Sequence, residues 1–162
     1  MRLVFDTSEV CVGCHLCEAA CSRVHFGVFN PRRSLIRIVT REPGIDRAAF
    51  CYQCRGVPCG KRCPTGAITY DAVAGLAKIA QDDCIGCGLC VEDCPFGVMS
   101  VDKAAGVAVK CDTCGGSPAC IPHCPTGVLK LKSNEQVAQE KRIAHVTRVE
   151  RAGARRAGVA DV

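Results

Sequence analysis

The chain has 162 residues, enough for one or two small domains. Sixteen of them are cysteines, Trp is absent, and Phe and Tyr number 5 and 2. So few aromatics cannot anchor a large hydrophobic core, which excludes a fold held mainly by packed aromatic side chains. A secreted disulfide scaffold would account for the cysteines. However, the first ten residues contain Arg2, Asp6 and Glu9 and no apolar run of a secretion signal. We therefore expect a cytoplasmic protein whose cysteines are metal ligands or redox groups.

The formal charge of +5 would suit a nucleic-acid binder. If the cysteines hold four cubane clusters, sixteen thiolates and four +2 cores bring this charge to about −3. No nucleic-acid partner is therefore expected. The longest stretch without a charged residue, 113–129, is interrupted by Gly, Pro and Cys, whereas a spanning helix needs about 20 mostly apolar residues. We also expect no direct membrane span.

Short strand-like segments separated by turns run through the first 132 residues. These segments are 3–5, 67–70, 76–79, 97–101, 107–109 and 128–131. The turns at 71–75 and 102–106 predict two hairpins, each made of the segments on either side of the turn. Pairing the first segment with the last would bring the two ends of this region together. Because no Pro follows Cys21, a helix at this position is expected to continue through Ser22 to Phe26.

The sixteen cysteines fall into four groups of four, and no cysteine is left over. The spacing is C-x2-C-xn-C-x3-C, where n is 2, 4, 2 and 5 in turn. The groups are Cys11, Cys14, Cys17 and Cys21; Cys51, Cys54, Cys59 and Cys63; Cys84, Cys87, Cys90 and Cys94; and Cys111, Cys114, Cys120 and Cys124. Pro64, Pro95 and Pro125 directly follow the last three groups. The wider spacings insert loops that either contact a partner or are simply tolerated.

This spacing is that of the bacterial ferredoxin run, which binds [4Fe–4S] clusters. Three cysteines two residues apart wrap a tight loop around one corner of a cube. The third and fourth cysteines are one helical turn apart, and the fourth ligates the neighbouring cluster. Structural zinc sites also use C-x2-C pairs, but they combine two well-separated pairs in one tetrahedral site. Four compact groups favour cubanes over zinc. Sixteen thiolates are enough for four clusters, so His15 and His123 are not expected to be ligands.

The composition changes beyond Leu131, because residues 133–162 contain neither Cys nor Pro. Six Lys and Arg residues and four acidic residues make this a basic tail. Apolar residues recur at roughly helical spacing and predict a helix over 134–152. The tail is either a solvated, fraying segment or an arm that lies on a partner subunit.

The four groups make the chain similar to the four-cluster polyferredoxin subunits that serve molybdenum and tungsten enzymes, hydrogenases and carbon monoxide dehydrogenases. The resemblance covers residues 1 to about 132 and implies an α+β fold of two ferredoxin-like modules with short hairpins and helices. The implied outer module is 1–30 with 105–132, the inner module is 45–104, and 133–162 is the helical tail.

In that family the groups pair in a nested way, first with fourth and second with third. The resemblance therefore implies four ligand sets, here called the first to fourth cluster. They are Cys11, Cys14, Cys17 and Cys124; Cys21, Cys111, Cys114 and Cys120; Cys51, Cys54, Cys59 and Cys94; and Cys63, Cys84, Cys87 and Cys90. Every iron would then carry a thiolate, which leaves no open position for a substrate. The chain is therefore expected to transfer electrons without being catalytic on its own.

A narrower resemblance rests on residues 13–38. The run Cys-Glu-Ala-Ala-Cys-Ser at 17–22, then Phe29-Asn30-Pro31 and Ser34-Leu35-Ile36-Arg37-Ile38, looks like the small iron–sulfur subunits of tungsten aldehyde oxidoreductases. It implies a tungsten or molybdenum catalytic subunit as one partner, and a flavin subunit or a soluble ferredoxin as the other. No Gly-rich nucleotide fingerprint occurs in this chain, so a flavin would lie on another subunit.

Other hypotheses remain open from the sequence. The chain could serve a carbon monoxide dehydrogenase, hydrogenase or formate dehydrogenase system instead. It could also be a structural or sensory iron–sulfur protein whose clusters hold an interface together. Clusters near both ends of the chain further suggest self-association that lengthens the electron path.

Overall fold

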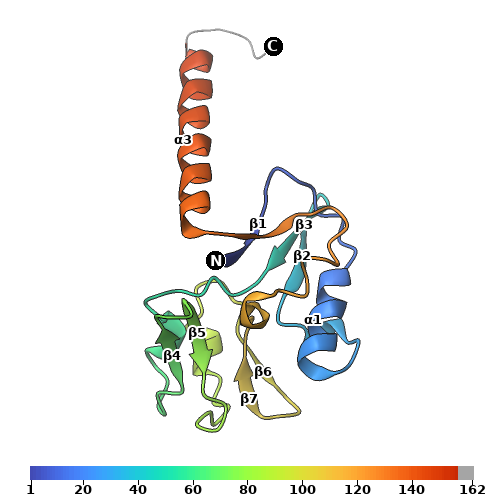
Figure 1. Ribbon diagram of the computed structural model, residues 1–162, viewed down its shortest axis with the longest axis vertical. Helices are drawn as coiled ribbons and strands as arrows, with labels where there is room; N and C mark the ends of the chain where they lie inside the picture. Colours follow the sequence, from blue (N-terminus) through green and yellow to red (C-terminus); the bar gives the residue numbers. More distant parts are fainter. Residues whose placement is uncertain (157–162) are drawn as a thin grey trace. The chain divides into compact units, whose positions relative to one another are not determined.

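The computed structural model describes residues 1–156, and side chains up to residue 152 (Figure 1). Residues 157–162 of the predicted tail lie outside this part. The chain divides into two compact units, one comprising Arg2–Leu131 and the other comprising the residues from Lys132 onward together with Met1. The four cysteine groups all belong to the first unit.

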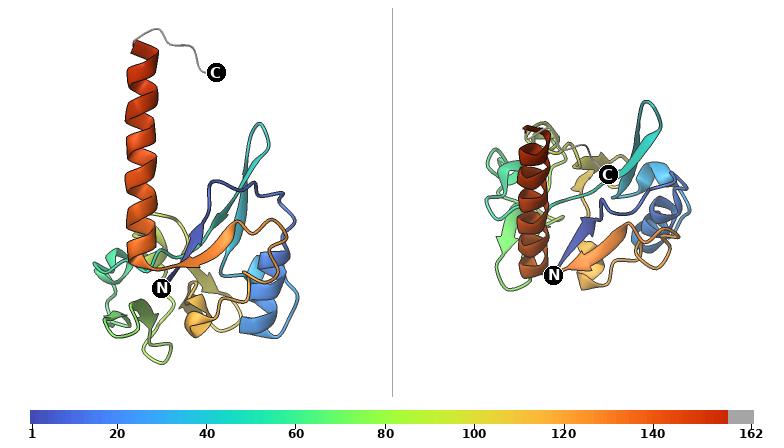
Figure 2. Two further views of the ribbon diagram at one scale, coloured as in Figure 1. Left: turned by 45° about the horizontal axis from the view of Figure 1, so that its top comes forward. Right: turned by 90° about the horizontal axis from the view of Figure 1, so that it is seen from above.

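Eight short strands form four two-stranded sheets (Figures 1 and 2). The pairs are β1 (Arg2–Phe5) with β8 (Leu129–Lys132), β2 (Arg37–Arg41) with β3 (Ile45–Ala49), β4 (Ile68–Asp71) with β5 (Leu76–Ile79), and β6 (Ser100–Asp102) with β7 (Val107–Val109). The last three pairs are antiparallel hairpins. Small sheets with few helices agree with the expected α+β fold of a ferredoxin-like domain.

The helices of the first unit are short and follow the cysteine groups. They are α1 (Leu16–Phe26), α2 (Leu89–Glu92) and the single-turn 3-10 helices η1 (Pro31–Arg33), η2 (Pro58–Gly60) and η3 (Thr113–Gly116). The prediction that the first helix continues to Phe26 is confirmed. It ends there because Gly27 adopts φ 71° and its N–H donates to the carbonyl of Arg23.

The second unit contains α3, which runs over Asn134–Arg156. The predicted helix at 134–152 is therefore present and is four residues longer. Ser133 begins it, since its hydroxyl accepts a hydrogen bond from the N–H of Gln136 while its own N–H donates to the Gln136 side chain. No helix within residues 1–156 is both long enough and apolar enough to cross a bilayer.

Three predicted strand pairings are present in the structure. The segment 67–70 is displaced by one residue, and the segment 97–101 begins only at Ser100 because Gly97 turns the chain at φ 61°. The sheet of β1 and β8 joins the two ends of the first unit, as expected. The hairpin of β2 and β3 was not predicted, although Pro43-Gly44 is a turn signal between its strands.

Two separate apolar clusters form the core of the first unit. The larger has eleven buried members, of which four are cysteines, and its most buried side chains are Phe50, Ile36 and Val128. The smaller has five buried members, Cys59, Ile68, Cys90, Met99 and Ala108. Cysteine thus supplies a large share of both cores, as the scarcity of aromatic residues indicated. The buried thiols are therefore a structural part of both apolar clusters.

Candidate metal centres

All sixteen cysteines are free thiols in the structure. The third cysteine of every group is buried, namely Cys17, Cys59, Cys90 and Cys120. Cys17, Cys59 and Cys90 lie within α1, η2 and α2, whereas Cys120 lies in a turn after η3. By contrast, Cys14 and Cys87, the second residues of groups one and three, are exposed. Each cysteine group therefore has at least one cysteine in the core, and groups one and three also have one at the surface.

One small cavity is lined by four thiol-bearing residues from opposite ends of the first unit. Cys11 and Cys14 come from the loop before α1, Cys17 from its first turn, and Cys124 from the turn before β8. The pairing of β1 with β8 brings these segments together. The rest of the cavity wall is mainly apolar, with Ile38, Ala48, Val128 and Leu129. The structure thus places together the four residues of the set expected for the first cluster.

A second small cavity has the same character. Cys84 and Cys87 come from the loop leading into α2, Cys90 lies in α2 itself, and Cys63 comes from the end of the second group. Ile68, Leu89 and Ala108 supply apolar walls. These four cysteines are the set expected for the fourth cluster.

The other eight cysteines, which make up the sets expected for the second and third clusters, interact electrostatically both within and between the sets. Burial raises the pKa of the Cys111 thiol to about 12, and Cys21 and Cys51 add to the rise. Burial likewise raises the pKa of Cys120 to about 12, and the next contributions come from Cys111, Cys114 and Cys21. Burial also raises the pKa of Cys59, and the charges of Cys51 and Cys94 raise it further. Burial raises the pKa of Cys51 as well, and Cys54 acts in the same direction.

Crowded, buried thiols of this kind suit a metal cluster. Without metal, the thiols hold their protons, because burial and mutual repulsion both oppose the thiolate form. Cys17 illustrates this, since burial, then Glu18, then Cys14 and Cys11 raise its pKa to about 12. A cationic iron core reverses that balance and binds the thiolates directly. The two cysteine-lined cavities thus each offer four sulfur ligands, as iron–sulfur clusters require.

Backbone N–H groups point towards three of the cysteine sulfurs. Leu35 donates to the Sγ of Cys21 at 3.4 Å, Gln53 to that of Cys51 at 3.4 Å, and Ala108 to that of Cys84 at 3.3 Å. Hydrogen bonds to sulfur are one of the means by which a protein adjusts the potential of a cluster.

Two Cys-Pro-Thr-Gly turns add hydroxyl contacts. The Oγ1 of Thr65 lies 3.6 Å from the Sγ of Cys63, and the Oγ1 of Thr126 lies 3.7 Å from the Sγ of Cys124. The Thr65 hydroxyl is the main reason that the pKa of Cys63 is lowered. At Cys124 burial acts to raise the pKa, but the N–H of Leu129 and the Thr126 hydroxyl outweigh it, so that pKa is lowered as well.

The histidines take roles that the cysteine spacing did not reveal. The Nδ1 of His15 is 2.7 Å from the Oε2 of Glu18, and that of His123 is 2.8 Å from the carbonyl of Ala119. His25, which the sequence analysis did not single out, places its Nε2 3.4 Å from the Sγ of Cys114 and 3.4 Å from the Oδ1 of Asp112. No spacing motif could have revealed this contact, because 89 residues separate His25 from Cys114.

These cavities and their ligands define an iron–sulfur protein with a ferredoxin-like fold. A family profile described as a 4Fe-4S dicluster domain matches residues 47–134. The match covers more than half of the chain, which therefore belongs to this family. The clusters are [4Fe–4S] clusters, and the zinc alternative is set aside.

Relatives from three organisms agree with this family. The chain is 41% identical over 109 residues to the polyferredoxin-like subunit of aliphatic sulfonate oxidoreductase from Pyrococcus furiosus, covering 67% of this chain and 63% of that subunit. It is 36% identical over 124 residues to the electron transport protein HydN of Escherichia coli, covering 68% and 70% of the two chains. It is 38% identical over 114 residues to the beta subunit of NADH-dependent phenylglyoxylate dehydrogenase from Aromatoleum evansii, covering 68% of this chain and 25% of that subunit. The chain is thus similar to an electron transport protein and to iron–sulfur subunits of oxidoreductases, and it spans 63% of the first of these relatives and 25% of the last.

Proposed function

We propose that the chain carries four [4Fe–4S] clusters, ligated by the nested cysteine sets, and conducts electrons through them one at a time. The observation that carries this proposal is that two of the nested sets each line one cavity, Cys11, Cys14, Cys17 and Cys124 in one case and Cys63, Cys84, Cys87 and Cys90 in the other. A [4Fe–4S] core changes by one electron with all four irons still held by thiolate. Such a site relays charge and offers no open iron to a substrate.

Contacts between sets support a linear order of the four clusters. Among the thiols that act on Cys120 of the second set is Cys17 of the first. Among those that act on Cys111 of the second set is Cys51 of the third. The third and fourth sets share the third-to-fourth cysteine turns of groups two and three, 59–63 and 90–94. The order is therefore first, second, third, fourth, with the outer module 1–30 and 105–132 followed by the inner module 45–104.

The two ends of this path are its most exposed parts. Cys14 of the first set and Cys87 of the fourth are exposed, and each lies beside an exposed apolar side chain, Val12 at 60% and Ile85 at 66%. Apolar patches at the surface are typical of protein contacts. These two positions are where redox partners would approach within transfer distance of the end clusters.

The resemblance suggests particular partners, and the relatives support only the broader point that the partner is an oxidoreductase. We infer a tungsten or molybdenum catalytic subunit at one end and a flavin subunit or soluble ferredoxin at the other, in a cytoplasmic complex. The similarity to a subunit of an aliphatic sulfonate oxidoreductase and to a subunit of phenylglyoxylate dehydrogenase supports service to a larger oxidoreductase. The clusters of this chain would form the electron path between the catalytic centre and the acceptor.

Anaerobic purification of the intact complex from its native host tests this function. Iron, sulfide, tungsten, molybdenum and nickel are quantified together, and about sixteen iron and sixteen sulfide per chain are expected with tungsten or molybdenum in the complex. Nickel would instead indicate a carbon monoxide dehydrogenase or hydrogenase partner. Zinc, or an iron content far below sixteen, would contradict the four-cluster assignment.

A structural or sensory role is distinguished by reductive titration. Clusters that conduct must be reduced when the substrate of the catalytic partner is added, and their EPR signals must appear within turnover time. Clusters that stay oxidised under those conditions would instead support an interface-holding role. Light scattering on the same complex tests self-association, because stacking through the two ends predicts species larger than discrete one-to-one complexes.

A further inference from the structure

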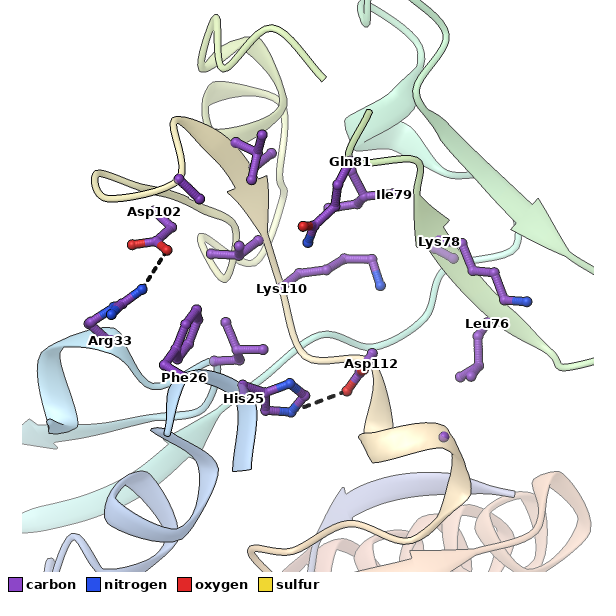
Figure 3. A pocket seen from close by; sticks show the side chains of 17 residues that line it. His25, Phe26, Arg33, Leu76, Lys78, Ile79, Gln81, Asp102, Lys110 and Asp112 are labelled. Atoms are coloured by element: carbon purple, nitrogen blue, oxygen red, sulfur yellow. Dashed lines mark hydrogen bonds and ion pairs between the residues drawn. The ribbon is translucent and has the colours of Figure 1, made fainter. Parts of the chain in front are cut away.

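Lys110 is a buried cation in the middle of the first unit. It follows β7 and precedes Cys111, and only 6% of its surface is exposed. Its side chain lines a cavity of about 550 Å³ whose walls come from β5, from β7 and from residues of the α1 and η1 region. Figure 3 shows the extended side chain of Lys110 crossing this space from the end of β7.

The ammonium of Lys110 is held by neutral groups. Its Nζ donates to the Oε1 of Gln53 at 3.2 Å and to the carbonyl of Cys111 at 3.3 Å. The Nε2 of Gln53 donates to the same Cys111 carbonyl at 2.6 Å, and its Oε1 also accepts the N–H of Ala77 at 3.1 Å. Gln53 is itself 7% exposed. This closed network fixes the ammonium in one position.

The other two cations at this cavity, Arg33 and Lys78, differ from Lys110, because each has a carboxylate partner. Arg33 lies 2.7 Å from Asp102, Lys78 lies 2.6 Å from Asp71, and His25 lies 3.4 Å from Asp112 (Figure 3 shows the first and third). Among residues 1–156, no carboxylate lies within 4.0 Å of the Lys110 ammonium. A buried charge without a counter-ion is expensive unless another negative group nearby compensates for it.

The nearest candidates for that negative charge are the two central clusters. Lys110 is adjacent in sequence to Cys111 of the second set, and its partner Gln53 donates its backbone N–H to the Sγ of Cys51 of the third set at 3.4 Å. The charge of Lys110 also acts to lower the pKa of Cys51 and Cys59, against the larger effect of burial. A cluster with four thiolates is an anion, so the ammonium and the clusters complement each other.

We propose that Lys110 raises the reduction potentials of the second and third clusters, and so keeps the middle of the electron path accessible to electrons from either end. This inference rests on the proposed cluster sets. Reduction adds one negative charge to a cluster, and a fixed cation at short range in a low-dielectric interior stabilises that added charge. Without it, two central clusters surrounded by buried thiolates would be the hardest to reduce.

Redox titration followed by EPR on the anaerobically purified holoprotein tests the inference. In Lys110→Met, which keeps the length of the side chain and removes its charge, the ratio of reduced to oxidised central cluster at a fixed potential should fall about tenfold, a shift of about 59 mV for a one-electron couple. Lys110→Arg should restore the wild-type midpoint. Lys78→Met, at the wall of the same cavity, should leave every midpoint unchanged.

Two further measurements distinguish an effect of the Lys110 charge from a change in packing or a loss of clusters. High salt should not remove the difference between wild type and Lys110→Met, because salt screens buried charges weakly. Iron content near sixteen in the variant keeps the cluster assignment intact while the potentials are compared. If Lys110→Met loses clusters, Lys110→Gln, which can still donate to both acceptors, should show the same downward shift. Unchanged midpoints in a neutral variant with full iron would overturn the proposal.

Discussion

The guanidinium of Arg33 donates to the carboxylate of Asp102 at 2.7 Å, although 69 residues separate them in the chain. The same guanidinium lies over the ring of Phe26, with its Cζ 4.3 Å from the ring centroid. Arg33 therefore links the region around α1 to the hairpin of β6 and β7. The side chain of Asp102 is only 9% exposed, so this ion pair is partly shielded from solvent.

Arg33→Ala should destabilise the protein by about 2 kcal/mol, because it leaves a shielded carboxylate without its charged donor. Chemical unfolding under anaerobic conditions measures this change. Arg62→Ala is the matched control, since Arg62 bonds Asp93 at 2.9 Å but is 57% exposed. Exposed pairs contribute at most about 1 kcal/mol. Equal losses in the two variants would contradict the structural role given to Arg33.

Gly86→Ala should prevent the fourth cluster from forming properly. Gly86 has φ 66°, and a Cβ at this position would lie 2.1 Å from the carbonyl oxygen of Gly106. Backbone strain and this clash together should destabilise the loop by about 3 kcal/mol or more. Iron content and thermal unfolding measure the effect. Gly56→Ala is the control, because it has nothing within 4 Å and should leave both unchanged.

Thr65→Val should lower the midpoint potential of the fourth cluster by removing the hydroxyl 3.6 Å from the Sγ of Cys63. A hydrogen bond to sulfur stabilises the reduced cluster, so its loss favours the oxidised form. Thr69→Val, the same exchange at an exposed position of β4, should change no potential. A redox titration in which both variants match the wild type would show that this hydroxyl does not adjust the cluster.

Removal of iron with a chelator under oxidising conditions should unfold the first unit, because cysteines form a large share of both cores. Loss of the cooperative thermal transition in circular dichroism is the expected result. Rebuilding the clusters should release protons, because the thiols of the unfolded chain are mostly protonated near pH 7 and bind iron as thiolates. Incorporation of iron and sulfide should therefore become more complete as the pH rises from about 7 to about 9.

Deletion of residues 133–162 should leave the clusters intact and weaken binding to a partner subunit. Ile143, Val146 and Val149 are each more than half exposed on α3, at spacings that place them near one face of the helix. Such an apolar stripe suits contact with another protein. Iron content and co-purification of the partner are the two measurements. Full partner binding by the truncated chain would favour the alternative of a solvated tail.

Local signals in the sequence predicted much of the fold. Turn residues at 71–75 and 102–106 located two hairpins, and the absence of Pro after Cys21 predicted the extent of α1. The hairpin of β2 and β3 was missed, because its strands carry charged residues and show only a weak apolar alternation. Here the Pro43-Gly44 turn was the better signal.

At the candidate site, the sequence predicted the cysteines but not their surroundings. The spacing of each group is a local property, so it is visible in the chain itself. The position of His25 beside Cys114, and of the Lys110 ammonium beside Gln53, depends on contacts between residues more than fifty positions apart. Nothing in the local pattern distinguishes such a buried lysine from a solvated one.

The distribution of the cysteines along the chain also bears on biosynthesis. Cys63, Cys84, Cys87 and Cys90 line their cavity within 28 consecutive residues, whereas the cavity at Cys11 is completed only by Cys124. On a translating ribosome, the site near the middle of the chain is complete long before the one that joins its two ends. The ligand set around Cys84 can therefore be completed during synthesis while Cys11, Cys14 and Cys17 still lack their fourth ligand, Cys124.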